Sequence, residues 1–103
     1  MSMTLTQVAT FLTEPFVRTG IYTTPEQALK HIFLEHIKRQ IIWAEMKLQC
    51  YEQKYGRPFA EWTAALTGQA TIGEEDDWME WEATLDMLDG WRRVKIAVEQ
   101  SGV

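Results

Sequence analysis

The amino-acid sequence predicts an all-α fold: a long antiparallel helical hairpin with a short connecting helix and a short N-terminal helix. Apolar residues recur at steps of three and four over two long stretches, and no stretch alternates as a strand does. Both stretches carry helix start signals. With 103 residues and 12.0 kDa, the chain forms a single domain (1–103) with a modest core. We therefore expect dimerisation to complete the fold.

The first long helix is predicted over residues 24–56. Thr24 and Gln27 form a capping box, and Pro25 suits the first helical position. Gly56 offers the left-handed conformation that ends helices. A helix of this size is about 45 Å long at 1.5 Å per residue, which exceeds the dimensions of a compact domain. The sequence thus predicts an elongated molecule.

Two apolar stripes follow this helix. The first is a packing seam with heptad steps, and the second lies off that seam. A helix with two apolar faces needs two neighbours. The seam consists of Leu29, Phe33, Ile37, Ile41, Ala44, Leu48, Tyr51 and Tyr55, and the second stripe of Ile32, Trp43, Met46 and Cys50.

The second long helix is predicted over residues 76–100. Asp77 is the expected cap, with Glu80 three residues on. Gly90 interrupts the helix at a cost of about 1 kcal/mol relative to alanine, which a close helix crossing or a slight bend would explain. The expected seam consists of Trp78, Trp81, Leu85, Leu88, Trp91, Val94 and Val98.

The remaining segments are a connector (57–75) and an N-terminal arm (1–23). In the connector, Pro58–Leu66 can form a short helix that ends at Gly68 and closes the hairpin core. In the arm, a short helix is expected from about Thr6 to Leu12. Turns are expected at residues 14–16 and 19–20.

The net charge of −5 argues against direct nucleic-acid binding, because phosphate contacts require clustered Lys and Arg. The charge is also uneven: residues 58–90 carry nine acids and no base, while the remainder carries ten bases and six acids. Such a chain can steer a basic partner to one end or pair head to tail with itself. A lone cysteine, no signal peptide and no membrane span predict a cytoplasmic protein that does not enter a membrane.

The sequence contains no convincing catalytic or cofactor motif. Di-iron helical proteins place Glu-x-x-His on their metal-bearing helices, and neither His31 nor His36 follows a glutamate at that spacing. His31 and Glu35 alone make a weak metal site, and solvated or half-buried histidines are the simpler interpretation. Cys50 lacks a visible base and is expected to be a packed thiol. We expect no enzyme activity, no metal and no cofactor.

The most informative segment runs from Glu74 to Asp89, with eight acids and no base. It is either the packed start of a helix or a surface that meets a basic partner. Capping would account for Asp77 and Glu80, although these residues with Asp76 could also hold a divalent cation. Core packing would account for the tryptophans, although they could also be partner hot spots. The predicted partner-binding residues are Glu74, Glu75, Asp76, Asp77, Trp78, Glu80, Trp81 and Glu82.

Two sequence runs resemble a known family. The runs YEQKYGRPFAEW (51–62) and EEDDWMEWEA (74–83) are similar to the small helical antitoxins encoded beside TumE-type toxins. Those proteins share a helix ending in Lys-Tyr-Gly, a short helix, an acidic spacer and an Asp-Tyr/Trp-x-x-Trp-Glu helix start. The present chain departs from that pattern at Arg57-Pro58, where a Met-Ser pair is expected, and residues 16–24 have no counterpart.

The resemblance implies a non-catalytic protein that binds and silences a co-expressed ribonuclease toxin. An acidic, aromatic surface can occupy the basic groove of such an enzyme as a substitute for phosphate. Two alternatives remain at this point. One is a phage-type acidic inhibitor that mimics nucleic acid against a host defence enzyme, and the other is a ferritin-like metal-binding helical protein.

Overall fold

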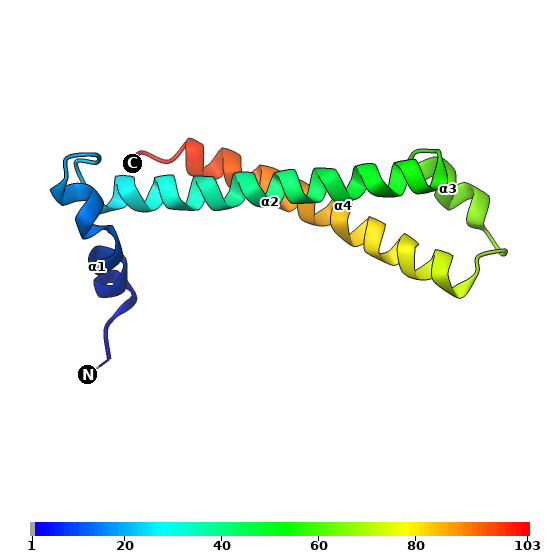
Figure 1. The fold of residues 1–103 in the computed structure, drawn as a ribbon, viewed down its shortest axis with the longest axis horizontal. Coiled ribbons are helices and arrows are strands. Elements are labelled where there is room, and N and C mark those ends of the chain that lie inside the picture. Colours follow the sequence, from blue (N-terminus) through cyan, green and yellow to red (C-terminus); the bar gives the residue numbers. More distant parts are fainter. Residues whose placement is uncertain (1) are drawn as a thin grey trace.

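The computed structural model describes residues 2–103, and this part of the chain contains four helices and no strand (Figure 1). They are α1 (Leu5–Arg18), α2 (Pro25–Tyr55), α3 (Phe59–Leu66) and α4 (Ile72–Glu99). Helices α2 and α4 pack against each other in opposite directions, and α3 lies where they diverge. Helix α1 turns away from the hairpin at the other end. The predicted all-α class and the long helical hairpin are confirmed.

Helix α2 lies within the residues that its capping signals predict. The Thr24 hydroxyl accepts a hydrogen bond from the Gln27 amide, while the Gln27 side chain accepts from the Thr23 amide instead of closing a capping box. At the other end, the Gly56 amide donates to the Glu52 carbonyl at 2.8 Å, and Gly56 has a φ of 67°. This left-handed conformation releases the chain toward α3.

We expect Gly56→Ala to lower the free energy of unfolding by about 1–2 kcal/mol, because an L-residue is strained in the left-handed region. A Cβ at Gly56 would have no neighbour within 4 Å, so the loss reflects backbone strain and not a clash. Urea unfolding followed by circular dichroism measures this loss. Gly56→Asn is the control, because asparagine tolerates this conformation better. Equal losses in the two variants would contradict the explanation.

Helix α4 begins at Ile72, earlier than predicted. Thr71 forms a complete capping box: its hydroxyl accepts from the Glu74 amide at 3.2 Å, and the Glu74 carboxylate accepts from the Thr71 amide at 3.1 Å. The prediction that Asp77 caps this helix with Glu80 is therefore wrong, because Thr71 supplies the same signature one and a half turns upstream. Asp77 and Glu80 are left free to make other contacts.

Helix α1 is longer than the predicted Thr6–Leu12. It is capped by Thr4 and continues through Pro15 to Arg18, so the turn expected at residues 14–16 is absent. The helix packs against the start of α2, where Thr13 and Ala28 are buried. The Thr13 hydroxyl donates to the Ala9 carbonyl at 2.7 Å, which satisfies this polar group without a partner from α2.

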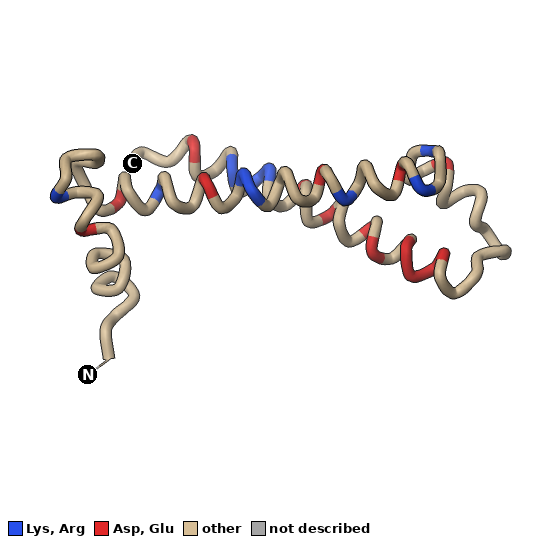
Figure 2. Tube along the Cα trace, viewed as in Figure 1, with Lys and Arg blue, Asp and Glu red and all other residues tan. Residues whose placement is uncertain are grey.

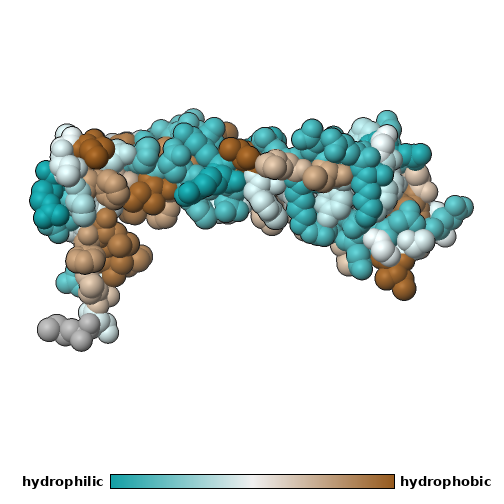
Figure 3. All heavy atoms as spheres, viewed as in Figure 1, coloured by the Kyte–Doolittle hydropathy of each residue, from teal (hydrophilic) through white to brown (hydrophobic). Residues whose placement is uncertain are grey.

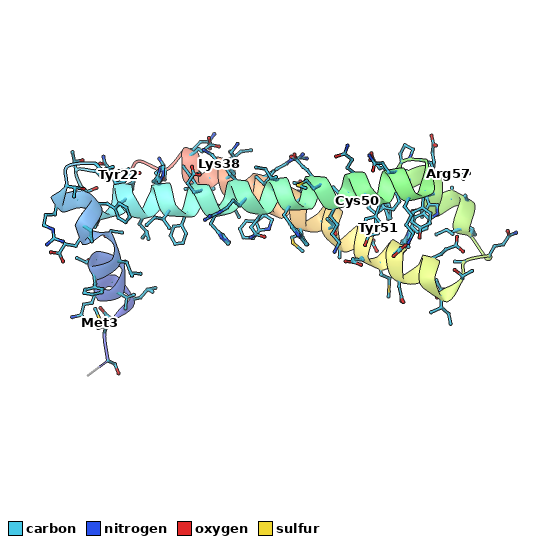
Figure 4. All side chains as sticks on the ribbon, in the orientation of Figure 1. Met3, Tyr22, Lys38, Cys50, Tyr51 and Arg57 are labelled. Atoms are coloured by element: carbon cyan, nitrogen blue, oxygen red, sulfur yellow. The ribbon has the colours of Figure 1, made fainter. Side chains whose placement is uncertain are left out.

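The core lies toward the α3 end of the hairpin. Tyr51 extends from α2 toward α4 (Figure 4), where its ring stacks on Trp81 with centroids 5.5 Å apart. Trp62 of α3 stacks on the other rings, 5.3 Å from Trp81. Most of the predicted α2 seam is buried or half-buried, but Phe33 is 52% exposed. The buried members of this cluster are Ala44, Leu48, Tyr51, Trp62, Trp81 and Leu88.

The molecule is elongated, with extents of 59 × 31 × 19 Å. Its radius of gyration is 19.8 Å, whereas a compact chain of this size has a value of about 13 Å. The second apolar stripe of α2 is exposed, including Cys50. The prediction of a packed thiol at Cys50 is therefore wrong. Within residues 2–103, no helix is both long and apolar enough to cross a bilayer.

Candidate partner-binding surface

Two of the predicted site residues, Asp77 and Glu80, form ion pairs with lysines of α2, although the Glu80 side chain is still 51% exposed. The Asp77 carboxylate accepts from Lys54 Nζ at 2.6 Å and from the Tyr55 hydroxyl. One turn further along α4, Glu80 pairs with Lys47. These contacts connect the two long helices at the α3 end of the hairpin.

The pKa shifts reflect these pairings. Hydrogen bonds from Lys54 and then Tyr55 lower the pKa of Asp77 below its usual 3.8. The pKa of Glu80 is lowered first by its hydrogen bond with Lys47. Burial raises the pKa of the Tyr55 hydroxyl, and the Asp77 carboxylate beside it adds to the rise. At neutral pH the carboxylates are charged acceptors and the tyrosine is a neutral donor, so this network is satisfied within the chain.

The two tryptophans of the segment belong to the interior of the hairpin end. Trp81 is 1% exposed and lies in the aromatic core, so it presents almost no surface to a partner in this conformation. Trp78 is half-buried, and its indole Nε1 donates to the Thr63 hydroxyl at 2.9 Å. Its ring packs on Phe59 with centroids 5.9 Å apart. For Trp81, the structure agrees with the core-packing interpretation.

The remaining acids point away from the hairpin. Glu74 is occupied in the capping box, whereas Glu75, Asp76 and Glu82 are exposed and form no ion pair with any residue in the described chain. Asp86 shares these properties, although it was not among the predicted site residues. Figure 2 shows the concentration of acidic residues along the first half of α4. We call Glu75, Asp76, Glu82 and Asp86 the acidic ridge.

Helical geometry places three members of the acidic ridge, Glu75, Glu82 and Asp86, on one outward face, while Asp76 lies about 100° around the helix from Glu75. Glu82 and Asp86 follow Glu75 by seven and eleven residues, spacings that return to the same side of a helix. Met79, 58% exposed, lies in the middle of this face, and the exposed Ile72 lies at its start. The face thus combines negative charge with apolar contact area. The spacing from Glu75 is visible in the sequence and is enough to place both Asp86 and Met79 on this face.

Other potentially reactive groups are scattered. Among residues 2–103, no group of three His, Cys, Asp or Glu side chains is close enough to hold a metal ion. The ring of His31 lies 5.5 Å from that of Tyr22, and the ring of His36 lies 5.6 Å from that of Trp91. Both histidines are exposed, in agreement with solvated side chains.

Comparison of the chain with known protein families, curated protein sequences and solved structures finds no match.

Proposed function

We propose that this chain is the antitoxin of a toxin–antitoxin pair, a non-catalytic protein that binds a basic ribonuclease toxin through the acidic ridge. The proposal unites two observations: the resemblance carried by residues 51–62 and 74–83, and the outward position of four acids. The second observation carries more weight because it depends on geometry and not on a motif.

The acidic ridge has no role in holding the hairpin together. Asp77 and Glu80 already bind the lysines of α2 that face α4, and Glu74 already caps the helix. Four adjacent uncompensated charges repel one another and disfavour the folded state slightly. A positively charged partner would remove this repulsion and gain electrostatic attraction. The ridge is thus better explained by recognition than by folding.

The dimensions and composition of the ridge suit an enzyme groove. From Glu75 to Asp86 it extends about 16 Å along α4, at 1.5 Å per residue. The groove of a ribonuclease is lined with cations that bind successive phosphates. The ridge would bind those cations, while Met79 would supply the apolar contact that is common at the centre of interfaces. Inhibition would follow from occupying the groove, without any reaction.

The decisive experiment measures binding to the product of the neighbouring gene, which we expect to be a short, basic protein. We expect Glu75→Gln combined with Glu82→Gln to slow association at least about tenfold at low salt, because charge steering acts mainly on the association rate. Glu26→Gln combined with Glu52→Gln is the matched control. It removes the same charge from exposed acids outside the ridge, neither of which forms an ion pair within residues 2–103.

Surface plasmon resonance at several salt concentrations provides the rates, and RNA cleavage by the partner provides the inhibition. The difference in association rate between the two variants should shrink as the salt concentration rises, because the Debye length is only about 10 Å at 0.1 M. Equal association rates for the ridge variant and its control would refute the role of the ridge. If the two proteins elute separately at low salt and RNA cleavage is not inhibited, the proposed antitoxin function is itself wrong.

A further inference from the structure

Each long helix carries a second heptad stripe outside the hairpin core. Both stripes keep the three-and-four spacing of helices that pack along their length. All of their members are exposed except Leu29, which is half-buried. Val94, which was predicted in the core seam of the second long helix, is 44% exposed, so that prediction is wrong. The stripe on α4 consists of Ala83, Met87, Gly90, Val94 and Ala97. The stripe on α2 consists of Leu29, Ile32, His36, Arg39, Trp43, Met46 and Cys50.

The two stripes emerge on the same side of the hairpin. His36 belongs to the α2 stripe, and its ring contacts Trp91, the neighbour of Gly90 on α4. The ion pair between Arg92 and Glu45 joins the helices on the opposite side, because these positions are rotated away from both stripes. Toward the α3 end, the ion pair between Lys47 and Glu80 lies between the stripes, with Lys47 Nζ 5.0 Å from the centre of the Trp43 ring. We call the two stripes together the apolar face.

Helix α1 covers only the beginning of the apolar face. Leu5 and Ala9 of α1 line a shallow groove with Leu29, and a second groove continues from Leu29 to Phe33 and Val98. Figure 3 shows apolar surface along α1 and at its junction with the hairpin. Within residues 2–103, no further element covers the stripes beyond this junction. A separate polypeptide would bury the rest of the apolar face.

The exposed area matches what one dimer interface would remove. The chain exposes 7613 Å². A compact monomer of this mass exposes about 6000 Å², so the excess is about 1600 Å². Obligate dimers bury about 1000–2500 Å² on each chain. A second copy that covers the apolar face would thus bring the exposed area into the usual range.

The charge distribution determines the orientation of that second copy. Residues 45–90, at the α3 end, contain eleven acids and three bases, a net charge of −8. The rest of the chain, at the other end, contains seven bases and four acids, a net charge of +3. A parallel pair would bring the two acidic ends together, whereas an antiparallel pair places each acidic end beside a basic one.

We propose that two copies of this chain pair antiparallel through the apolar face, with the two-fold axis passing close to Gly90. The contacts of His36 with Trp91 and of Glu45 with Arg92 place Gly90 level with the middle of α2. A Cβ at Gly90 would meet nothing within 4 Å, so the chain itself makes no close crossing there. On the two-fold axis, the absence of a side chain lets the α4 helices of the two copies approach closely.

The same axis passes α2 near Ile41. It therefore brings Arg39 of each copy opposite Trp43 of the other. Arg39 forms no ion pair with any residue of the described chain. Trp43 is exposed, and Lys47 Nζ of its own chain lies over one side of its ring, 5.0 Å from the centroid. A guanidinium stacks well on an indole ring, so the polar residue in the α2 stripe has a suitable partner. Glu75 and Glu82 of the acidic ridge lie on the neighbouring face of α4 and remain accessible to a toxin, whereas Asp76 lies in line with Ala83, Gly90 and Ala97 at steps of seven residues.

The first test compares Val94→Glu with Ile96→Glu by light scattering after size-exclusion chromatography. Val94 is 44% exposed on the apolar face, and Ile96 is 53% exposed on the opposite side of the same helix turn. We expect the unaltered protein to have the mass of two chains, and Val94→Glu to raise the dissociation constant at least about 100-fold, because it buries an unpaired charge in each copy. Ile96→Glu should stay dimeric.

The second test fixes the geometry. With Cys50→Ser as background, Gly90→Cys should form a disulfide-linked dimer under mild oxidation, because only residues near the axis meet their own counterparts. Ile96→Cys in the same background should not. A monomeric unaltered protein at the highest soluble concentration, or dissociation by Ile96→Glu but not Val94→Glu, would overturn the proposal. If the protein is a dimer but Gly90→Cys forms no disulfide between the two copies, the proposed position of the two-fold axis is wrong.

Neither test involves a toxin. The proposed dimer and the proposed antitoxin function can therefore fail independently.

Discussion

Replacing Trp81 with alanine is expected to lower the free energy of unfolding by about 3–5 kcal/mol, a large part of the stability of a chain this small. The indole is 1% exposed and lies among aromatic rings from the two other helices of the hairpin end, α2 and α3. Its removal would leave a cavity that Tyr51 and Trp62 cannot both fill, since each is held by its own helix. Urea unfolding followed by circular dichroism, at one fixed protein concentration, measures the loss.

Met79→Ala is the matched control for this prediction. Met79 lies less than one turn from Trp81 but is 58% exposed, so its truncation should change the stability by no more than about 0.5 kcal/mol. Trp81→Phe should retain part of the lost stability, because it preserves ring stacking with a smaller cavity. A loss below about 1 kcal/mol for Trp81→Ala would show that the aromatic cluster does not hold the hairpin end together.

The second large effect is expected at acid pH. The pKa values of Asp77 and Glu80 are lowered in the folded protein, by hydrogen bonds from Lys54 and from Lys47 respectively. Their stabilising contribution is therefore fully present above the unfolded-state pKa values and is lost as the pH falls through the folded-state values. We expect the free energy of unfolding to fall as the pH is lowered below the usual carboxyl values of 3.8 and 4.5.

Asp77→Asn isolates one part of this dependence. At pH 7 it should lower the free energy of unfolding by about 1.5–3 kcal/mol, because the Lys54 and Tyr55 donors lose a charged acceptor. The difference from the unaltered protein should shrink as the pH falls and Asp77 becomes protonated. Asp76→Asn is the control, since Asp76 is exposed and forms no ion pair within residues 2–103. Parallel pH profiles for Asp77→Asn and the unaltered protein would disprove this role.

Periodicity and capping predicted much of the fold from the sequence. The seam of α2 identified Ile37, Ala44 and Leu48 as buried, and Gly56 marked the end of the helix. The start of α4 was misplaced because Asp77 and Thr71 both resemble caps, and local sequence does not rank them. Tertiary contact decided between them: Asp77 is engaged by Lys54 and Tyr55, which leaves Thr71 to cap the helix.

The candidate site was harder to predict than the fold. Eight residues of one segment were expected to meet a partner, but Asp77 and Glu80 form pairs across the hairpin and Trp81 is buried. These pairings depend on the register between α2 and α4, which the length and path of the connector determine. A sequence pattern reports the face of a single helix and not that register. The outward position of Glu75 and Glu82 depends only on the face of one helix, so the sequence could indicate it, and their binding to a partner stays a prediction.

The aromatic cluster at the α3 end gives the hairpin a preferred order of assembly. Tyr55 and Trp62 stack across one tight bend, so little chain entropy is lost when they meet. At the other end, Lys30 Nζ donates to the carbonyl of Val103 at 2.8 Å, across 73 residues of chain. Contacts between near neighbours in sequence form first, because their loops are short. We therefore expect the two long helices to pair first next to the bend and the contacts at the far end to form last.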